Sequence, residues 1–158
     1  MSIEKRAFRD AMGCFATGIC VASASAADGK PVGVTVNSFS SVSLDPPLVL
    51  FCIDRKAESA PAFQQAAGFA LSILAEDQKE ISANFAVAPM ATRWDGMPMA
   101  IWESGAPVLT GGLATLDCAL HAVHDGGDHL IIVGRVLRLE SRAGSPLLYY
   151  RGAYTTLV

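Results

Sequence analysis

The chain has 158 residues, of which 51% are hydrophobic and 17% charged, and its formal net charge is −3. This length predicts a single domain over residues 1–158, and the negative charge, without any run of Lys or Arg, argues against nucleic acid and anionic membranes as partners. The sequence has neither the apolar stretch of a signal peptide nor about 20 consecutive apolar residues that could span a bilayer, so we expect no membrane contact and a cytoplasmic location.

The first predicted elements are a helix and a buried strand. Residues 3–15 place Phe8, Met12 and Phe15 on one stripe, which is the pattern of an amphipathic helix. Residues 19–26 are small and apolar, which predicts a buried strand. The chain as a whole is more apolar than a small domain needs, and this predicts that part of its surface is covered in a homodimer.

A strand with one polar face comes next and begins near residue 32. Val34 and Val36 alternate with Thr35 and Asn37, so the two pairs point to opposite faces. The alternation fails over residues 38–41, and a bulge or a strand break there would explain the change of phase.

The rest of the chain predicts strands that mostly follow one another without helical crossovers. The expected elements are a strand at 48–53, a short helix from about Ser59, a strand at 69–74, a helix opened by a capping box at Asp77 and Glu80 and running to about Phe85, two long strands at 112–124 and 129–141, and a last strand from about Leu147. Residues 87–110 contain three prolines and are expected to be irregular. This order favours a mainly β fold, an antiparallel barrel with helices at its ends.

The segment 33–47 is the first candidate for a binding site, because it is rich in Ser and Thr around Asn37. Buried hydroxyls need hydrogen-bond partners, so such a strand suits a ligand-binding face better than a core. The alternative is an ordinary strand with one face in solvent.

The second candidate is Asp54-Arg55-Lys56, directly after an apolar strand. Two cations and the Ser59 hydroxyl at a helix start predict a phosphate site, although a charged loop in solvent has the same pattern.

The third candidate is the histidine set. His121 and His124 point to opposite faces of a strand, so we predict no metal site. His129 begins a strand directly after Gly-Gly-Asp, where it could donate a hydrogen bond to a carboxamide. The four cysteines form no C-x-x-C pair and are expected to be core residues.

Three motifs connect these candidates. They are Thr-Val-Asn-Ser-Phe at 35–39, Ser-Leu-Asp-Pro-Pro at 43–47 and Gly-Asp-His at 127–129. With the segments 8–24, 69–86, 105–120 and 146–154, they make the chain resemble the flavin reductase-like family over nearly its whole length. That family includes the small reductase components of two-component flavin monooxygenases.

The resemblance implies a split β-barrel of the FMN-binding type that is active as a homodimer, with the flavin in a groove near the dimer interface. It implies FMN, or else FAD, as cofactor and NADH or NADPH as hydride donor. The implied cofactor-binding residues are Thr35, Asn37, Ser38, Ser40 and Ser41 along the flavin ring and ribityl chain, Cys52, Ile53, Asp54, Arg55, Lys56 and Ser59 past the flavin and around its phosphate, Ser82, Asn84 and Phe85 in a further segment, and Tyr154 or Tyr150 closing the nicotinamide pocket. His129 is the implied catalytic residue at the nicotinamide.

The implied function is an NAD(P)H:flavin oxidoreductase that supplies reduced flavin to a partner monooxygenase. One alternative is a flavin-binding or electron-transfer module of the same fold without nicotinamide turnover. Another keeps the barrel but changes the ligand, to pyridoxal phosphate or haem.

Overall fold

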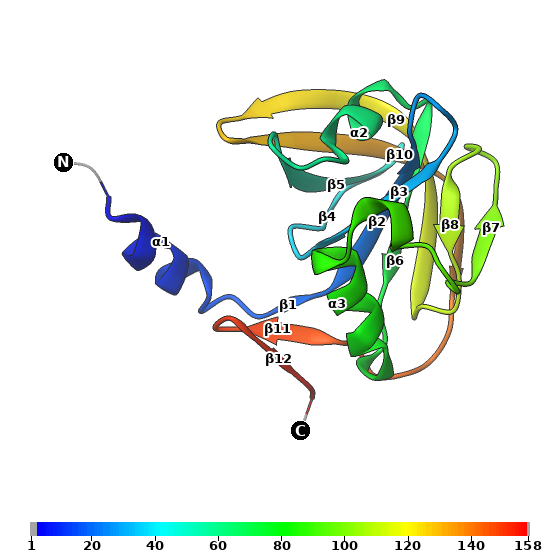
Figure 1. Ribbon diagram of the computed structural model, residues 1–158. Helices are drawn as coiled ribbons and strands as arrows, with labels where there is room; N and C mark the ends of the chain where they lie inside the picture. The colour runs from blue at the N-terminus through cyan, green and yellow to red at the C-terminus, as the bar shows by residue number, and fades with distance from the viewer. Residues whose placement is uncertain (1–2, 158) are drawn as a thin grey trace.

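The computed structural model describes residues 3–157 and consists mainly of antiparallel strands (Figure 1). Its helices are α1 (Lys5–Met12), α2 (Ala60–Gln65), α3 (Lys79–Val87) and two short 3₁₀ turns, η1 (Glu76–Gln78) and η2 (Met90–Thr92). Its strands are β1 (Thr17–Gly18), β2 (Cys20–Ser25), β3 (Pro31–Val36), β4 (Ser40–Leu44), β5 (Pro47–Asp54), β6 (Gly68–Ile73), β7 (Met99–Ile101), β8 (Pro107–Leu109), β9 (Ala114–Gly126), β10 (His129–Ser141), β11 (Leu148–Tyr150) and β12 (Ala153–Thr155).

A seven-stranded antiparallel sheet dominates the fold, with the strand order β3-β2-β6-β9-β10-β5-β4. Strands β3 and β4 are consecutive in the chain but form opposite edges of this sheet, so the sheet has to curl for the link at residues 37–39 to join them. The predicted strand break is confirmed, because β3 ends at Val36 and β4 begins at Ser40. The predicted mainly β, antiparallel fold class is confirmed as well.

The main core lies inside the curled sheet and is covered by α2. The ring of Phe51 packs edge-on against Phe63 and Phe69, with centroid separations of 5.2 and 5.3 Å. All three rings are buried. Each such pair contributes about 0.5–1.5 kcal/mol beyond the area it buries, so these rings hold β5, α2 and β6 together.

A second, smaller core lies between the outer side of the sheet and α3. Phe85 of α3 is fully buried there, and its ring centroid is 5.0 Å from that of Trp94. The ring also lies directly against Gly33 of β3, where a Cβ atom would sit only 2.5 Å from Cε1 of Phe85. Glycine at position 33 is therefore what lets α3 approach the sheet.

Two expectations about local structure are wrong. Asp77 does not cap α3, because the chain already turns at Glu76 and the side chain of Gln78 instead accepts a hydrogen bond from Ala75 N at 2.8 Å. The segment 87–110 is only partly irregular, since β7 and β8 pair within it. Pro107 is tolerated there because it is the first residue of its strand.

The N-terminal helix α1 is shorter than predicted, and none of its side chains is buried. Its first turn is capped by Glu4, whose carboxylate accepts from Arg6 N at 2.9 Å and from Ala7 N at 2.8 Å. The apolar stripe of Phe8, Met12 and Phe15 is 53%, 56% and 78% exposed, and α1 extends away from the sheet in Figure 1. Among the helices of residues 3–157, none is long and apolar enough to cross a membrane.

Candidate functional site

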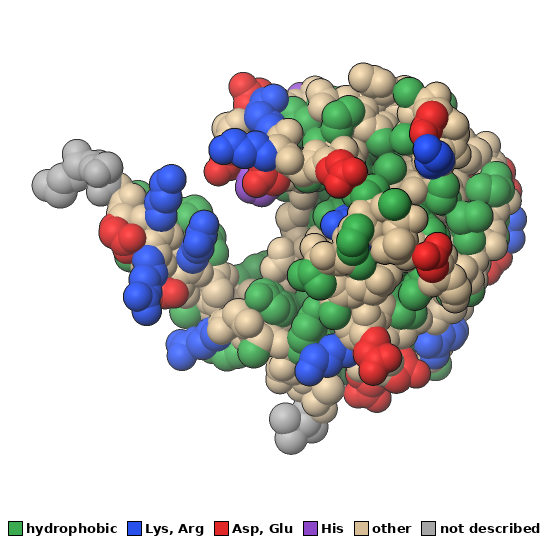
Figure 2. Space-filling view, in the orientation of Figure 1, with side chains coloured by type: hydrophobic (Ala, Val, Ile, Leu, Met, Phe, Trp, Pro, Cys, Tyr) green, Lys and Arg blue, Asp and Glu red, His purple; other side chains and the backbone are tan. Residues whose placement is uncertain are grey.

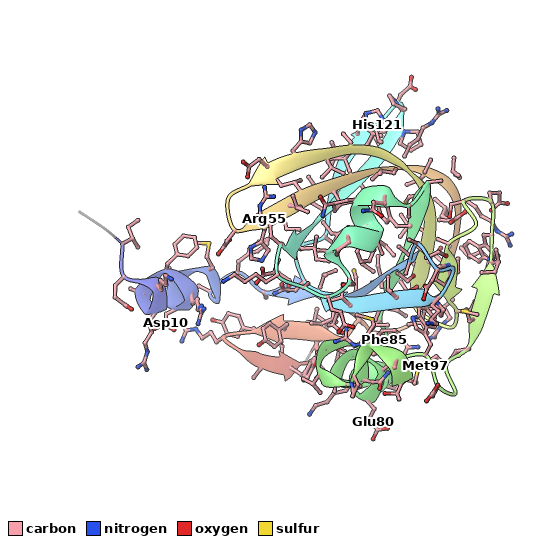
Figure 3. The ribbon with its side chains drawn as sticks, turned by 45° about the horizontal axis from the view of Figure 1, so that its top comes forward. Asp10, Arg55, Glu80, Phe85, Met97 and His121 are labelled. Atoms are coloured by element: carbon pink, nitrogen blue, oxygen red, sulfur yellow. The ribbon has the colours of Figure 1, made fainter. Side chains whose placement is uncertain are left out.

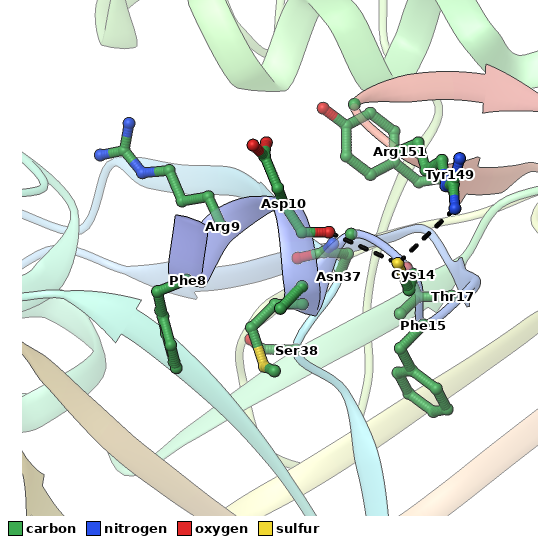
Figure 4. A pocket seen from close by; sticks show the side chains of 14 residues that line it. Phe8, Arg9, Asp10, Cys14, Phe15, Thr17, Asn37, Ser38, Tyr149 and Arg151 are labelled. Carbon is green, nitrogen blue, oxygen red and sulfur yellow. Dashed lines mark hydrogen bonds between the residues drawn. The ribbon is translucent and has the colours of Figure 1, made fainter. Parts of the chain in front are cut away.

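A hollow of about 1280 Å³ opens between α1 and the main body of the protein. Figure 2 shows it as the cleft beside the projecting, cation-rich α1. In Figure 1 the β9–β10 hairpin lies above this opening and the β11–β12 hairpin below it. Figure 4 shows Asn37 and Ser38, from the link between β3 and β4, and Tyr149 and Arg151, from the β11–β12 hairpin, among the residues that line it. Apolar walls around a few polar groups are typical of a ligand pocket.

The link at residues 37–39 supplies the polar groups of this hollow. The hydroxyl of Ser38 accepts from Cys52 N at 2.8 Å and donates to the Cys52 carbonyl at 3.0 Å. Asn37, directly before it, is exposed. The two bonds of Ser38 therefore fix the link against β5 and leave the Asn37 amide turned to the hollow.

Ser40 and Ser41 begin the edge strand β4, and both are exposed. The hydroxyl of Ser40 donates to the Ser41 carbonyl at 3.0 Å. The register of β4 against β5 shifts between Ser41 and Ser43, which is the kind of irregularity that re-aims side chains beside a binding site.

One outer face of the sheet brings several predicted residues together. His129 pairs with Asp54 across the β5–β10 ladder, and paired residues point to the same face. Cys52 shares that face because it is two residues from Asp54. Phe51 and Ile53 point to the other face and are buried in the core, so Ile53 offers only its backbone to a ligand.

His129 stands at the rim of this face with its side chain 44% exposed. Its Nδ1 lies 2.7 Å from Oδ1 of Asp128. The hydrogen bond from His129, followed by the charge of that ring, holds the pKa of Asp128 below its ordinary value. Because the carboxylate takes Nδ1–H, the Nε2 atom is left for a ligand.

The predicted phosphate residues follow β5. Ser59 is 1% exposed, and its Oγ has no hydrogen-bond partner among the described residues. Lys56 is exposed, and its backbone N–H bonds to Asp54 Oδ1 at 2.8 Å. Arg55 turns instead toward the β9–β10 hairpin, as Figure 3 shows, and its side chain donates to Gly127 and Asp125.

Thr35, Ser82 and Tyr154 form a connected set under α3. Thr35 Oγ1 donates to the Ser82 carbonyl at 2.6 Å, and the Ser82 hydroxyl lies 2.8 Å from the Tyr154 hydroxyl. The structure thus joins three predicted residues from β3, α3 and β12. Tyr154 belongs to β12, and in Figure 1 the β11–β12 hairpin lies across the opening from the β9–β10 hairpin.

Asn84 and Phe85 have structural partners. The Asn84 amide donates to the Arg93 carbonyl at 2.6 Å, and the Arg93 guanidinium donates to the Gly33 carbonyl at 2.7 Å. Phe85 is buried against Trp94 and so does not reach the hollow with its ring.

Sequence reasoning missed Thr17, Tyr149 and Arg151, which line the hollow. The Thr17 hydroxyl is buried without a hydrogen-bond partner among residues 3–157. Arg151 has a φ of +48°, an uncommon value for a residue with a side chain. Gly152 was a signal for this tight hairpin turn, because its φ of +81° is a value that glycine adopts readily.

Two of the four cysteines are core residues, as predicted. Burial raises the pKa of Cys20 to about 12, and burial together with the nearby Asp117 charge raises the pKa of Cys118 to about 12. Cys14, by contrast, is exposed and Cys52 half-buried. Within residues 3–157 no group of three or more His, Cys, Asp or Glu side chains is arranged to hold a metal ion.

A curled antiparallel sheet, with a polar link between its two edge strands and a hollow beside that link, is the architecture of a small split-barrel protein. Residues 12–158 match the flavin reductase like domain, and the chain belongs to that family. The predicted family and its split-barrel fold are confirmed.

Named relatives agree with this assignment. The chain is 46% identical over 151 residues to the FMN reductase (NADH) SmoA of Agrobacterium fabrum, covering 96% of this chain and 85% of that protein. It is 42% identical over 155 residues to HsaB, the reductase subunit of a flavin-dependent monooxygenase of Rhodococcus jostii, covering 98% of this chain and 78% of that one. The solved structure of the NADH:FAD oxidoreductase SgcE6 of Streptomyces globisporus, in complex with NAD and FAD fragments, has a TM-score of 0.90 at 32% identity and covers 100% of this chain and 97% of that one.

Proposed function

We propose that this protein, as a single domain, is an NAD(P)H-dependent flavin reductase that transfers a hydride from the nicotinamide to FMN or FAD. One observation carries the proposal: His129, Asp54 and Cys52 share an outer sheet face, and Ser38 hydrogen-bonds Cys52 from the edge of the hollow. This arrangement offers a rim histidine and a strand of small polar groups on one continuous surface. The relatives SmoA and SgcE6 carry the same activity in their names.

Asn37, which lines the hollow, and the polar residues of β4 and of the loop after β5 suit a flavin. Its pyrimidine edge needs hydrogen-bond partners, and the Asn37 amide and the Ser40 and Ser41 hydroxyls offer them. Its phosphate needs cations and donors, and Lys56 with the unpartnered Ser59 hydroxyl supplies both. A buried hydroxyl without a partner costs about 1–3 kcal/mol, which a phosphate oxygen at Ser59 would relieve.

The protein's part in the reaction is to hold the flavin and the nicotinamide and to orient them toward each other. A bound flavin would supply the hydride acceptor, so no side-chain nucleophile is required. His129, fixed through Nδ1 by Asp128, presents Nε2 to the nicotinamide carboxamide, accepting from its NH₂ group when neutral and donating to its carbonyl when protonated. Holding the nicotinamide and flavin rings in the correct alignment can lower the activation barrier of the reaction in solution by up to about 7–11 kcal/mol.

The same proposal includes a homodimer in the cytoplasm. Phe8 and Met12 are exposed on a helix that has no buried side chain, and Phe15, just beyond the end of that helix, is exposed as well. A second copy that covers this stripe would also add to the wall of the hollow beside α1.

We further propose that the reduced flavin passes to a partner monooxygenase. The hollow is open to solvent on the side of α1, so a bound flavin has a way out (Figure 2). The relative HsaB is named as the reductase subunit of such a system.

The decisive experiment is the oxidation of NADH and NADPH, followed by absorbance, with FMN, FAD or riboflavin added to the purified protein. Turnover with at least one pair is expected. Absence of turnover with every pair would reject the reductase, and a yellow protein without turnover would select the alternative of a flavin-binding or electron-transfer module. An absorption spectrum of pyridoxal phosphate or haem in the purified protein would select the remaining alternative.

Two variants test the named roles. His129→Ala should lower turnover with reduced nicotinamide far more than flavin affinity, whereas His121→Ala, on the exposed outer part of β9, should change neither. Lys56→Ala should weaken FMN binding but leave riboflavin binding unchanged, because riboflavin lacks the phosphate. An equal loss for FMN and riboflavin would exclude a phosphate contact at Lys56.

A further inference from the structure

The turn between β9 and β10 projects from the body with little packing of its own. Every residue from Val123 to Asp128 is exposed, and His129, directly after the turn, is only half-buried. Segments with few buried contacts open at low free-energy cost. Hydrogen bonds to this turn, rather than apolar contacts, therefore decide how well His129 is held.

Arg55 makes those bonds from outside the hairpin. Its backbone N–H donates to the Asp128 carbonyl at 3.0 Å. Its side chain donates from Nε to the Gly127 carbonyl at 2.8 Å and from Nη2 to Asp125 Oδ1 at 2.8 Å. Within residues 3–157, no other side chain outside the hairpin hydrogen-bonds to residues 125–128.

Asp125 joins this contact to the turn itself. The same Oδ1 that accepts from Arg55 also accepts from Gly127 N at 2.9 Å. The bond from Gly127, and then the Arg55 guanidinium, hold the pKa of Asp125 below its ordinary value, so the carboxylate is charged at neutral pH. Gly127 has a φ of +80°, which makes this turn a position for glycine.

We propose that Arg55 is a positioning residue that clamps the β9–β10 turn and thereby fixes the rim histidine, His129, for the nicotinamide. The proposal rests on the reductase function proposed above. Two donors of Arg55 are already committed to the hairpin, which leaves Lys56 and Ser59 as the phosphate partners. Asp54 pairs with His129 in the β5–β10 ladder, and Arg55 is the next residue in the chain. The hydrogen bonds of Arg55 to the turn therefore act directly beside the pairing that places the histidine.

The test compares Arg55→Ala, Arg55→Lys and Asp125→Ala with the wild type, using both FMN and riboflavin as acceptors. Loss of positioning should lower kcat/KM for the nicotinamide by about 10- to 100-fold, to the same extent with either acceptor. Arg55→Lys should recover only part of the loss, because lysine keeps the charge but not the two-pronged geometry. The control is Asp28→Asn, which breaks the exposed Lys30–Asp28 ion pair of the β2–β3 turn and should change nothing.

Two double variants sharpen the result. The double variant Arg55→Ala with Asp125→Ala should lower kcat/KM no further than the more severe single variant does, since both substitutions remove the same Arg55–Asp125 contact. Arg55→Ala should add little to His129→Ala if it acts through the histidine. A loss confined to FMN affinity and absent with riboflavin would make Arg55 a phosphate ligand and overturn the clamp, as would full additivity with His129→Ala or unchanged kinetics. A wild-type protein without nicotinamide oxidation would instead reject the proposed function.

Discussion

Helices α1 and α3 have similar lengths and both carry aromatic side chains, yet they are used in opposite ways. Phe85 of α3 is fully buried, and the hydroxyl of Ser82 is bonded to Tyr154. On α1, Phe8 and Met12 are more than half exposed, and no side chain is buried. The first turns differ in the reverse sense, because α1 is capped by Glu4 whereas α3 has no side-chain cap.

This difference shows what stabilises each helix. Helix α3 depends on tertiary packing against the sheet and does without a cap. Helix α1 depends on its own cap and, in the proposed homodimer, on a second copy. An apolar stripe in a sequence therefore predicts that a helix has a partner, but not whether the partner belongs to the same chain.

The largest expected effect is the loss of stability on removing the buried ring of α3. Phe85→Ala should lower the free energy of unfolding by about 3–5 kcal/mol, because it leaves a cavity between α3, Gly33 and Trp94. Urea denaturation measures this. Val87→Ala on the exposed side of the same helix should cost no more than about 0.5 kcal/mol. Equal costs for both variants would mean that α3 is not held by Phe85.

The next effect concerns the stripe of α1. Replacing Phe8 or Met12 with Ser should weaken the proposed dimer by about 10- to 100-fold per position, since burying such a side chain is worth about 1.5–3 kcal/mol. Sedimentation velocity over a range of concentrations measures the dissociation constant. Arg6→Ser, a polar change on the same helix, should leave it unchanged. An unaltered dimer in all three variants would place the interface elsewhere.

A smaller effect is expected for the polar contact of α3. Ser82→Ala should cost about 1 kcal/mol, the net worth of one hydrogen bond, because it removes the partner of the Tyr154 hydroxyl. Tyr154→Phe and the double variant complete the cycle, and urea denaturation of all four proteins gives the coupling between the two hydroxyls. Strict additivity would show that the 2.8 Å contact contributes nothing.

The smallest effect is a pH dependence at the first turn of α1. Hydrogen bonds from Arg6 N and Ala7 N lower the pKa of Glu4 below 4.5 in the folded protein. The cap is therefore fully present above pH 4.5 and is lost as the pH falls through the lowered folded-state pKa. Backbone amide shifts of Arg6 and Ala7 should move toward coil values in that range, and Glu4→Gln should remove the pH dependence. The first turn of α3, without a side-chain cap, should not respond.

Much of the fold could be predicted because its strands carry local signals. The last long strand was expected at residues 129–141, where β10 is observed, since a glycine turn precedes it and its apolar run is long. The β7–β8 pair was missed because each strand has only three residues, too few for a pattern to repeat. Asp117 gave no signal either. Its carboxylate is buried and accepts from Ser104 N at 2.8 Å, a partner on a loop that the sequence could not place.

Part of the candidate site could likewise be predicted from the sequence, and part could not. The hydroxyl-rich segment around Asn37 and the rim position of His129 could be predicted from residue types and turns. The bonds of Ser38 to Cys52, and of Arg55 to the β9–β10 turn, could not, because they join strands whose register only the folded sheet defines. Phe85 was predicted near the flavin, but its ring packs in the second core, because Gly33 leaves space for it there.

The pairing of β1 with β11 has a consequence for the order in which the protein can form. Thr17 lies opposite Tyr149, so β1 can pair with β11 only after the long stretch of chain between them has been made. Hairpins such as β9–β10 can close while the chain is still leaving the ribosome. The side of the hollow lined by Thr17 and Tyr149 therefore forms later than these hairpins, and a chain cut short before Leu148 would lack it.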